Sequence, residues 1–488
     1  MENGGPAIPP SEATATGAVP GPAPADDASV RKSALFVAVI ASFLTPFAAS
    51  SVNVALPTIG TELHMDAVLL SWVSTGFLLA SASTLVPFGR MADLHGRKRL
   101  FLYGMMVWTA FSLLCALMPT GPALIAMRFG QGVGGGMIFG TSVAILTSVY
   151  PPSDRGRVLG ISVAAVYLGM SVGPFVGGLI TSTLGWRAIF LLNVPLGLVV
   201  VAVTASKLKG EWAGARGERF DLPGAAVYMV MIMSVVVGFA VLPGWDGFAL
   251  LLAGMAILGA FVAWERRTPS PVLDIRMFSG NRVFAFSNMA TLINYAATFA
   301  VGFFMSLYLQ NIRGLSPETA GLVLLSQPIV QAALSPAAGR LSDRVEPRVV
   351  ASVGMAMTFA GLLYLSTLKE GTPMSLVVGS LALLGLGFAL FSSPNTNAIM
   401  GSVRRSHYGL ASSMVSTMRG IGQTLSMGVA SMLLGIYVGA HEVTGTAFHP
   451  EFMASFHVGF AVFSVLCLVG IFASLVRGNL RGPDGNGE

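Results

Sequence analysis

Charged residues are scarce in this chain of 488 residues: Asp, Glu, Lys and Arg make up only 10% of it, and 54% is hydrophobic. Soluble proteins carry about 25% charged residues, so a soluble globular fold is excluded. A nucleic-acid-binding protein needs clustered Lys and Arg, and a net charge of +6 in so apolar a chain is no sign of one. The only two cysteines, Cys115 and Cys467, lie inside apolar runs. This placement argues against a disulfide framework and a thiolate metal site.

The first 30 residues are rich in Pro, Ala and Gly and carry scattered acidic residues, which predicts a disordered tail. Arg31 and Lys32 then precede an uncharged run over 33–61. That run is too long for the apolar core of a cleavable signal peptide. It is long enough for a membrane-spanning helix, so we expect a first spanning helix that the protein keeps.

Fourteen apolar stretches long enough to cross a bilayer lie between charged loops, which predicts an all-α membrane protein with both termini on one side. If the termini are cytoplasmic, 23 of the 28 Lys and Arg residues fall on that side. Three fall on the other side and two, Arg128 and Arg419, lie within helices. This asymmetry follows the positive-inside rule and predicts a multi-pass protein of the cytoplasmic (inner) membrane.

Two loops share the pattern Gly-Arg-x-small-Asp, 250 residues apart, at Gly89–Asp93 and Gly339–Asp343. Such repetition indicates two duplicated halves. Pairing the equivalent helices leaves two extra helices in the middle of the chain. The expected organisation is a tail (1–32), a six-helix bundle (33–206), a linker with helices 7 and 8 (207–282), a second six-helix bundle (283–476) and a tail (477–488).

Three motifs in this order resemble those of the major facilitator superfamily, and within it the 14-helix drug:proton antiporter group. Gly89–Arg99 resembles the superfamily's cytoplasmic loop motif, and residues 128–134 (RFGQGVG) are similar to its R-x-x-Q-G-x-G segment. The fifth helix matches the glycine pattern associated with exporters, through Gly160, Gly169, Gly173, Pro174, Gly177 and Gly178. The resemblance covers nearly all of 33–476 and implies a fold of two six-helix bundles plus two central helices.

The loop motif has a physical interpretation of its own. Asp93 lies in a glycine-flanked turn among basic residues, where its carboxylate can cap a helix and pair with Arg155 or Arg157. A contact made in only one of two states would act as a conformational latch. The alternative is a solvated loop that only sets topology, which leaves the repeated Gly and Asp spacing unexplained. The predicted latch residues are Gly89, Arg90, Asp93, Gly96, Arg97, Lys98, Gly339, Arg340 and Asp343. In the fifth helix the glycines predict close packing, with gating as the functional interpretation.

Arg128 and Arg419 are costly within a bilayer and are expected to face a cavity or a partner. Each has a glutamine on its own helix face, Gln131 and Gln423 respectively. The alternative is that each arginine only bonds backbone carbonyls and holds helices together. The other polar groups of apolar helices complete the expected substrate cavity: Asn53, Tyr167, Asn294, Tyr295, Gln327, Gln331, Asn395 and Asn397. Each of them can instead bond a neighbouring helix.

The chain departs from the antiporter group at Ala48, which stands where that group typically has an Asp in the first helix. All 22 Asp and Glu residues map to tails, loops or within about a turn of a helix end. Lipophilic dications should therefore be poor substrates, and anionic or neutral amphiphiles better ones. Asp93 and His457 are the candidates for proton coupling, His457 because histidine titrates near neutrality.

These observations predict a monomeric transporter that exports small amphiphilic molecules by alternating access, coupled to proton influx as the resemblance implies. The alternative is an exporter of an anionic metabolite with weak or no proton coupling. A membrane enzyme is not expected, because the six histidines form no metal-spaced cluster and no Ser/His/Asp set shares one depth. A receptor or scaffold would not need two matching loop motifs. Cofactors, metals and nucleic-acid partners are not expected.

Overall fold

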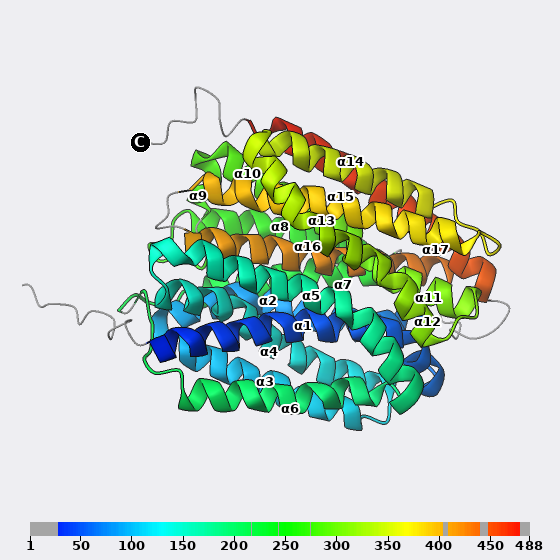
Figure 1. Ribbon diagram of the computed structural model, residues 1–488, viewed down its shortest axis with the longest axis horizontal. Helices are drawn as coiled ribbons and strands as arrows, with labels where there is room; N and C mark the ends of the chain where they lie inside the picture. Colours follow the sequence, from blue (N-terminus) through cyan, green and yellow to red (C-terminus); the bar gives the residue numbers. More distant parts are fainter. Residues whose placement is uncertain are drawn as a thin grey trace, which may run out of the picture.

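The computed structural model describes residues 28–215, 217–242, 244–273, 275–403, 408–439 and 448–478. The predicted tails lie almost entirely outside these residues. The described chain is almost entirely helical, and its helices run side by side in one bundle (Figure 1).

The N-terminal half consists of six helices, which fill the lower part of Figure 1. They are α1 (Ala28–Glu62), α2 (Ala67–His95), α3 (Arg97–Leu117), α4 (Gly121–Val149), α5 (Pro152–Leu184) and α6 (Arg187–Ser206). A hairpin of α7 (Leu222–Val241) and α8 (Trp245–Glu265) follows, and then the short α9 (Arg276–Gly280).

The C-terminal half fills the upper part of Figure 1, and its first two spans are each divided into shorter helices. The first span is α10 (Arg282–Thr298), α11 (Ala300–Leu307) and the π-helical turn η1 (Tyr308–Ile312); the second is α12 (Pro317–Leu324) and α13 (Ser326–Arg344). The remaining helices are α14 (Pro347–Leu365), α15 (Met374–Gly401), α16 (Tyr408–Tyr437) and α17 (Phe448–Val476).

Thirteen spans in the described part of the chain are long and apolar enough to cross a membrane. The 30-residue α16, whose only charged residue is Arg419, packs among them against α2, α7 and α10 and makes the fourteenth. The predicted all-α membrane fold is therefore confirmed. The start of α1 and the end of α17 lie at the same end of the bundle, at the left of Figure 1. We call this the basic end, because Arg90, Arg97 and Arg344 lie there.

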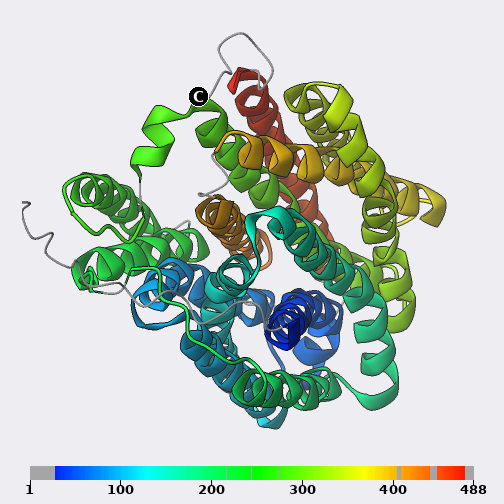
Figure 2. The same cartoon turned by 60° about the vertical axis from the view of Figure 1, so that its left-hand side comes forward.

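The two halves repeat one packing pattern. In the first half α1 packs against α5, α2 against α4, and α3 against α4 and α6. In the second half the corresponding helices pair in the same way: α10 with α16, α13 with α15, and α14 with α15 and α17. The halves meet where α2 packs against α16 and where α5 packs against α12 and α13. Figure 2 shows α16 between the two halves.

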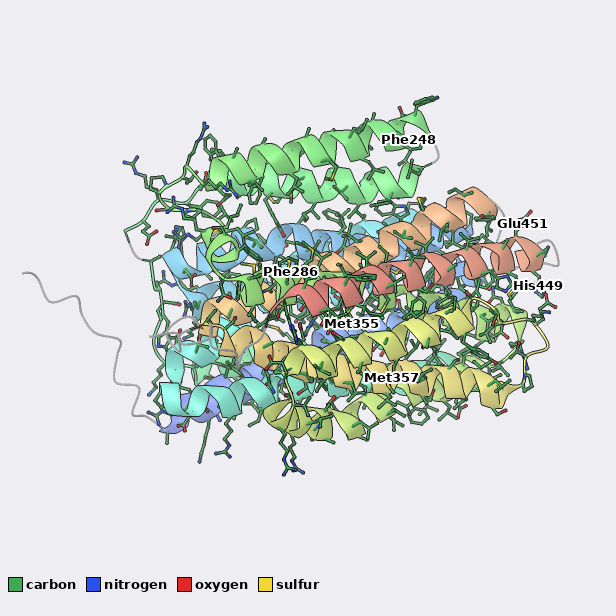
Figure 3. The ribbon with its side chains drawn as sticks, turned by 90° about the horizontal axis from the view of Figure 1, so that it is seen from above. Phe248, Phe286, Met355, Met357, His449 and Glu451 are labelled. Atoms are coloured by element: carbon green, nitrogen blue, oxygen red, sulfur yellow. The ribbon has the colours of Figure 1, made fainter. Side chains whose placement is uncertain are left out.

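The α7–α8 hairpin lies beside this junction as a separate pair (Figure 3). Its inner side packs on α2 and α16, and the Tyr228 hydroxyl donates to the carbonyl of Ala82 at 3.1 Å. Its outer side exposes large apolar side chains, among them Trp245, Phe248 and Leu252. Exposed apolar surface of this kind suits contact with lipid tails.

Local sequence accounts for several helix boundaries. Asp66 caps α2 by accepting the Leu69 N–H at 2.7 Å, and Asn281 caps α10 by accepting the Phe284 N–H at 2.9 Å. Gly96 ends α2 with a φ of 119°, a conformation that favours glycine, so the chain turns at once into α3.

The half-to-half contact is tight at the end opposite the basic end. A Cβ atom at Gly178 of α5 would overlap the backbone of Pro317, and one at Gly321 of α12 would overlap Pro174. Nearby, the hydroxyls of Ser71 and Ser431 are 2.7 Å apart. Backbones that approach this closely leave no passage between α5 and α12 at this end.

The predicted glycine pattern of α5 serves two interfaces. Gly169, Gly173 and Gly177 face α1 of the same half, and Gly178 faces α12 of the other half. Gly160 has no atom within 4 Å of its Cβ position. Most of these glycines thus pack α5 within its own half.

We predict that Gly177→Ala lowers thermal stability, because its Cβ would lie 2.7 Å from the Cα of Ser51. The expected cost is about 1–3 kcal/mol, as for other overpacked sites. Heating the detergent-solubilised protein with a thiol-reactive dye reports the loss, since Cys115 and Cys467 are both buried and free.

Gly160→Ala on the same helix is the control, since it has the same helix propensity and open space around the added methyl group. Equal melting temperatures for the two variants would show that α5 does not pack as described.

Candidate functional site

A cavity of about 170 Å3 lies between the two halves. Residues of α1, α2, α4 and α5 line it from one half, and residues of α10, α13, α15 and α16 from the other. None of the described residues that line it is Asp or Glu. Six of the twelve predicted cavity residues do line it: Asn53, Tyr295, Gln327, Gln331, Arg419 and Gln423.

Arg419 is the cationic group of this cavity. It lies on α16, between the halves, with its guanidinium carbon 5.1 Å from the centre of the Tyr295 ring. Its Nε and the Gln331 amide nitrogen are buried atoms, for which the described part of the chain offers no hydrogen-bond partner. The Tyr295 hydroxyl lies close to the hydroxyls of Tyr167 and Ser392. The cavity wall therefore presents two unused groups able to donate hydrogen bonds.

Aromatic rings supply much of the remaining wall, and the polar-residue pattern did not indicate them. They are Phe77, Phe139, Phe299 and Phe388. Helical spacing could have indicated one of these rings. Phe77, Ser81 and Leu85 lie four residues apart on α2, so they share one face of the helix, and all three line the cavity. The wall thus combines aromatic surface with a few donors, a composition typical of sites for small organic ligands.

Arg128 lies outside the cavity lining, in the interior of the N-terminal half, and is 0% exposed. Its Nε donates to the Val73 carbonyl at 2.9 Å and its Nη1 to Gln131 Oε1 at 2.5 Å. Gln131 in turn donates to the hydroxyl of Ser112 at 2.7 Å. The guanidinium also lies 4.4 Å from the ring centre of Phe77, which does line the cavity. In this conformation Arg128 and Gln131 support the cavity wall without forming it.

The remaining predicted residues also lie outside the lining. Tyr167 of α5 shares a hydrogen bond with the Ser392 hydroxyl of α15, across the halves. Asn397 donates to Ser342 at 2.9 Å, and the buried Asn294 has no partner among the described residues. Of these residues, Tyr167 lies within electrostatic reach of Arg419 and next to Tyr295, although it does not line the cavity.

Asn395 belongs to a polar cluster of the C-terminal half. Its amide nitrogen donates to the Ser287 carbonyl at 3.0 Å and to the Thr291 hydroxyl at 2.9 Å. Its Oδ1 accepts from Arg477 at 2.7 Å. Arg477 was assigned to the tail, yet it is only 1% exposed and packs inside the bundle. Burial lowers the pKa of Arg477 to about 10, so it stays charged at neutral pH.

A vestibule of about 520 Å3 lies at the basic end and shares Leu85, Phe139 and Ser416 with the cavity. Arg90, Asp93 and Arg97 of the first loop motif line it, together with Glu218 and residues 269–273. The cavity therefore adjoins the hollow at the basic end, whereas helices meet tightly at the opposite end.

The loop motif binds its own half and the segment 207–221. Asp93 pairs with Arg97 at 2.7 Å, in place of the expected pairing with Arg157. Arg97 follows the sharp turn at Gly96, so its guanidinium reaches back to Asp93 and also donates to the Ala144 carbonyl at 3.0 Å. Arg157 is exposed, and the side chain of Arg155 lies outside those described.

Segment 207–221 is held along this motif by backbone and side-chain bonds. The Arg97 N–H donates to the Trp212 carbonyl at 2.8 Å, and the Ala215 N–H donates to the Asp93 carbonyl at 3.0 Å. Glu211 accepts the Lys98 N–H at 2.9 Å. Glu218 pairs with Arg90 at 2.5 Å, and hydrogen bonds from Arg90 and Ser270 lower the pKa of Glu218.

The second motif copy and His457 lie apart from the cavity. Gly339 packs near Ser393, Arg340 is exposed, and the side chain of Asp343 lies outside those described. His457 of α17 is half-buried, and its Nε2 lies 2.6 Å from the Leu368 carbonyl.

Comparison with known proteins agrees with this architecture. The family model described as Major Facilitator Superfamily matches residues 38–214 and 288–487, that is, both halves without the α7–α8 hairpin. A solved bacterial homologue of the human lysosomal transporter Spinster, in an inward-facing and unoccupied conformation, superposes with a TM-score of 0.66. It shares 16% sequence identity, over 92% of this chain and 97% of that one.

Two curated relatives are more similar in sequence. The cephamycin export protein CmcT of Amycolatopsis lactamdurans is 31% identical over 465 residues, which cover 92% of this chain and 94% of that protein. Multidrug resistance protein Stp of Mycobacterium tuberculosis is 32% identical over 398 residues, which cover 80% of this chain and 73% of that protein. The chain is thus a multi-pass membrane transporter and belongs to the major facilitator superfamily.

Proposed function

We propose that this transporter exports small amphiphilic organic molecules by alternating access, coupled to proton influx. The printed names of CmcT and Stp, a cephamycin exporter and a multidrug resistance protein, support the export of drug-like molecules. The observation that carries the proposal is the cavity between the halves, which combines an aromatic wall with unused hydrogen-bond donors. A ligand that offers both apolar surface and acceptor atoms complements such a wall.

The charge of the cavity favours anionic or neutral ligands. Arg419 is the charged residue among the described lining, and its ring contact with Tyr295 leaves the guanidinium Nε free to bind. A carboxylate or sulfonate that accepts from Arg419 and Gln331 would form charge-assisted hydrogen bonds, which are stronger than neutral ones. A cation would meet Arg419 without a compensating carboxylate.

The basic end is proposed to face the cytoplasm, because most Lys and Arg residues of the loops fall there. The vestibule would then admit substrate from the cytoplasm, and the tight α5–α12 contact would close the outer side. Export requires that this contact separate and that the vestibule close. The loop motif and segment 207–221 would serve as the latch of this movement, since they line the vestibule.

Proton coupling requires a group whose protonation differs between the two states. Asp93 is one candidate, because it lines the vestibule and pairs with Arg97, and closure of the vestibule would change the surroundings of this pair. His457 is the second candidate, at the other end of the bundle.

The alternative function is export of an anionic metabolite with weak or no proton coupling. One observation favours it: the cavity lining described here contains no carboxylate to exchange a proton against substrate. Arg419 would then be the counter-charge of the metabolite.

We predict that Arg419→Gln reduces transport of anionic aromatic amphiphiles about tenfold or more, because a hydrogen bond to a charged group is worth about 1.5–3 kcal/mol. A neutral analogue of the same size should lose much less. Flux into or out of proteoliposomes measures both. Arg267→Gln is the control, because Arg267 is exposed at the basic end.

The same vesicles test the coupling. Proton antiport predicts faster anion and neutral flux with an imposed pH gradient, and no effect of the gradient supports the alternative. The assigned substrate class would be refuted if cationic amphiphiles were transported faster than anionic and neutral ones and if Arg419→Gln left their transport unchanged.

We predict that Gly96→Ala impairs transport by displacing segment 207–221. Its added Cβ would overlap the Glu211 carboxylate group, and a φ of 119° is strained for alanine. Limited proteolysis within 207–221 should become faster, and transport slower.

Gly185→Ala is the matched control, since Gly185 also has a positive φ, of 82°, but no atom within 4 Å of its Cβ position. If both variants lose transport equally, backbone strain alone accounts for the loss and segment 207–221 is not part of the latch.

A further inference from the structure

Two buried carboxylates lie at the foot of the α7–α8 hairpin, at the basic end. Asp221, 8% exposed, caps α7: its Oδ1 accepts the Gly224 N–H at 2.9 Å and its Oδ2 the Trp264 indole N–H at 2.8 Å. Glu265, the last residue of α8, is 2% exposed, and its Oε2 accepts the Leu273 N–H at 3.1 Å. Asp221 therefore joins the two ends of the hairpin to each other, and Glu265 joins α8 to the segment that follows it.

One carboxylate oxygen of this pair has no hydrogen-bond partner. Glu265 Oε1 is buried and has no hydrogen-bond partner in the described part of the chain. An atom at the Cβ position of Gly224 would lie 2.9 Å from this oxygen and closer still to Asp221 Oδ2. Both carboxylate oxygens therefore face the same small space beside Gly224. Two buried negative charges this close repel each other, and one bound proton removes the repulsion. A protonated Oε1 would also have a hydrogen to donate.

Arg90 of α2 is the cation within electrostatic reach of Glu265, and Asp221 is the neighbouring anion. Arg90 Nη2 pairs with Glu218 Oε2 at 2.5 Å, while its buried Nε has no partner among the described residues. Arg266 and Arg267 follow Glu265 and are exposed, and Asp274 lies outside the described residues. Glu218 has a lowered pKa and stays ionised. Glu265, with its unpartnered oxygen beside Asp221, is the group of this set that is placed to hold a proton.

We propose that Asp221 and Glu265 share one proton, and that this proton decides whether Arg90 pairs with Glu218 or with the Glu265 carboxylate. When the proton is present, Glu265 is neutral and Arg90 holds Glu218. When Glu265 releases it to water of the vestibule, which Leu273 lines, the new carboxylate competes with Glu218 for the guanidinium.

The consequence concerns segment 207–221. Loss of the Arg90–Glu218 pair removes a side-chain bond that ties this segment to α2, so deprotonation would loosen the proposed latch. This step rests on the proposed function, in which the segment takes part in transport. The shared proton itself does not depend on that function, and it can be detected separately.

Infrared spectroscopy of the purified protein tests the proton directly. A protonated carboxyl C=O band should be present at neutral pH in the wild type and absent in Glu265→Gln. It should persist in Asp246→Asn, whose carboxylate is exposed in the first turn of the same helix. Absence of the band in the wild type, or its persistence in Glu265→Gln, would overturn the proposal.

Transport tests the effect on the latch. With equal pH on both sides of the vesicle, wild-type flux should fall about threefold or more as the pH is raised through the titration of Glu265. Glu265→Gln, a permanent mimic of the protonated acid, should keep the faster flux at every pH. The link to transport would be overturned if the wild type showed the infrared band but the flux of Glu265→Gln still depended on pH as in the wild type.

Asp221→Asn provides a second route if Glu265→Gln does not fold. Asparagine can still cap α7, but it removes the charge that opposes ionisation of Glu265. The infrared band should then disappear at a lower pH than in the wild type. An unchanged titration would show that the two residues do not share a proton. Failure of proton antiport in the vesicle experiment would leave this titration unaffected, so the two proposals can be told apart.

Discussion

A charge inside the hydrocarbon layer must find its partners within the protein, because lipid offers none. Arg128 and Arg419 lie within spanning helices, and the buried Arg477 directly follows the last one. The three find their partners in different ways. Arg128 bonds Gln131 and the Val73 carbonyl and lies over Phe77, and Arg477 bonds Asn395 and Ser287. Arg419 has a ring contact with Tyr295, and its Nε remains unused. The first two stabilise helix packing within each half, although Nη2 of Arg477 also has no partner among the described residues. Arg419 has an unused donor where the two halves meet and lines the cavity there.

The same constraint explains the position of the carboxylates. Each described Asp and Glu lies in a loop, at a cap or within about a turn of a helix end. For most of them water, a basic residue or a helix N-terminus can compensate the charge there; the buried Glu265 is an exception. The cavity wall is therefore left with amides, hydroxyls, rings and one guanidinium. In the proposed function, substrate recognition would therefore take place in the middle of the bundle and proton binding at its ends.

The sequence alone was sufficient for the number of helices and the duplicated halves, because both follow from apolar length, loop charge and repeated motifs. It could not distinguish Arg128 from Arg419, since each has a glutamine on its own helix face. Which way a helix points depends on tertiary packing, and an apolar helix has similar residues toward lipid and toward the core. For the same reason Asn395 was expected in the cavity but packs against α10, and Phe77 was not expected there although it lines the wall. The partner of Asp93 depends on the turn at Gly96, which the motif alone does not specify.

The α7–α8 hairpin shows how an apparently passive element can carry chemistry. Its length is apolar and its outer face suits lipid, so its residues within the membrane suggest no role beyond filling space. Its two ends, however, bring Asp221 and Glu265 together against Arg90 of the loop motif. Because the hairpin is inserted between the halves, a change of charge at its foot would act on the segments that connect them. A proton held there would sense the pH at the basic end without entering the cavity, which separates control of the latch from recognition of the substrate.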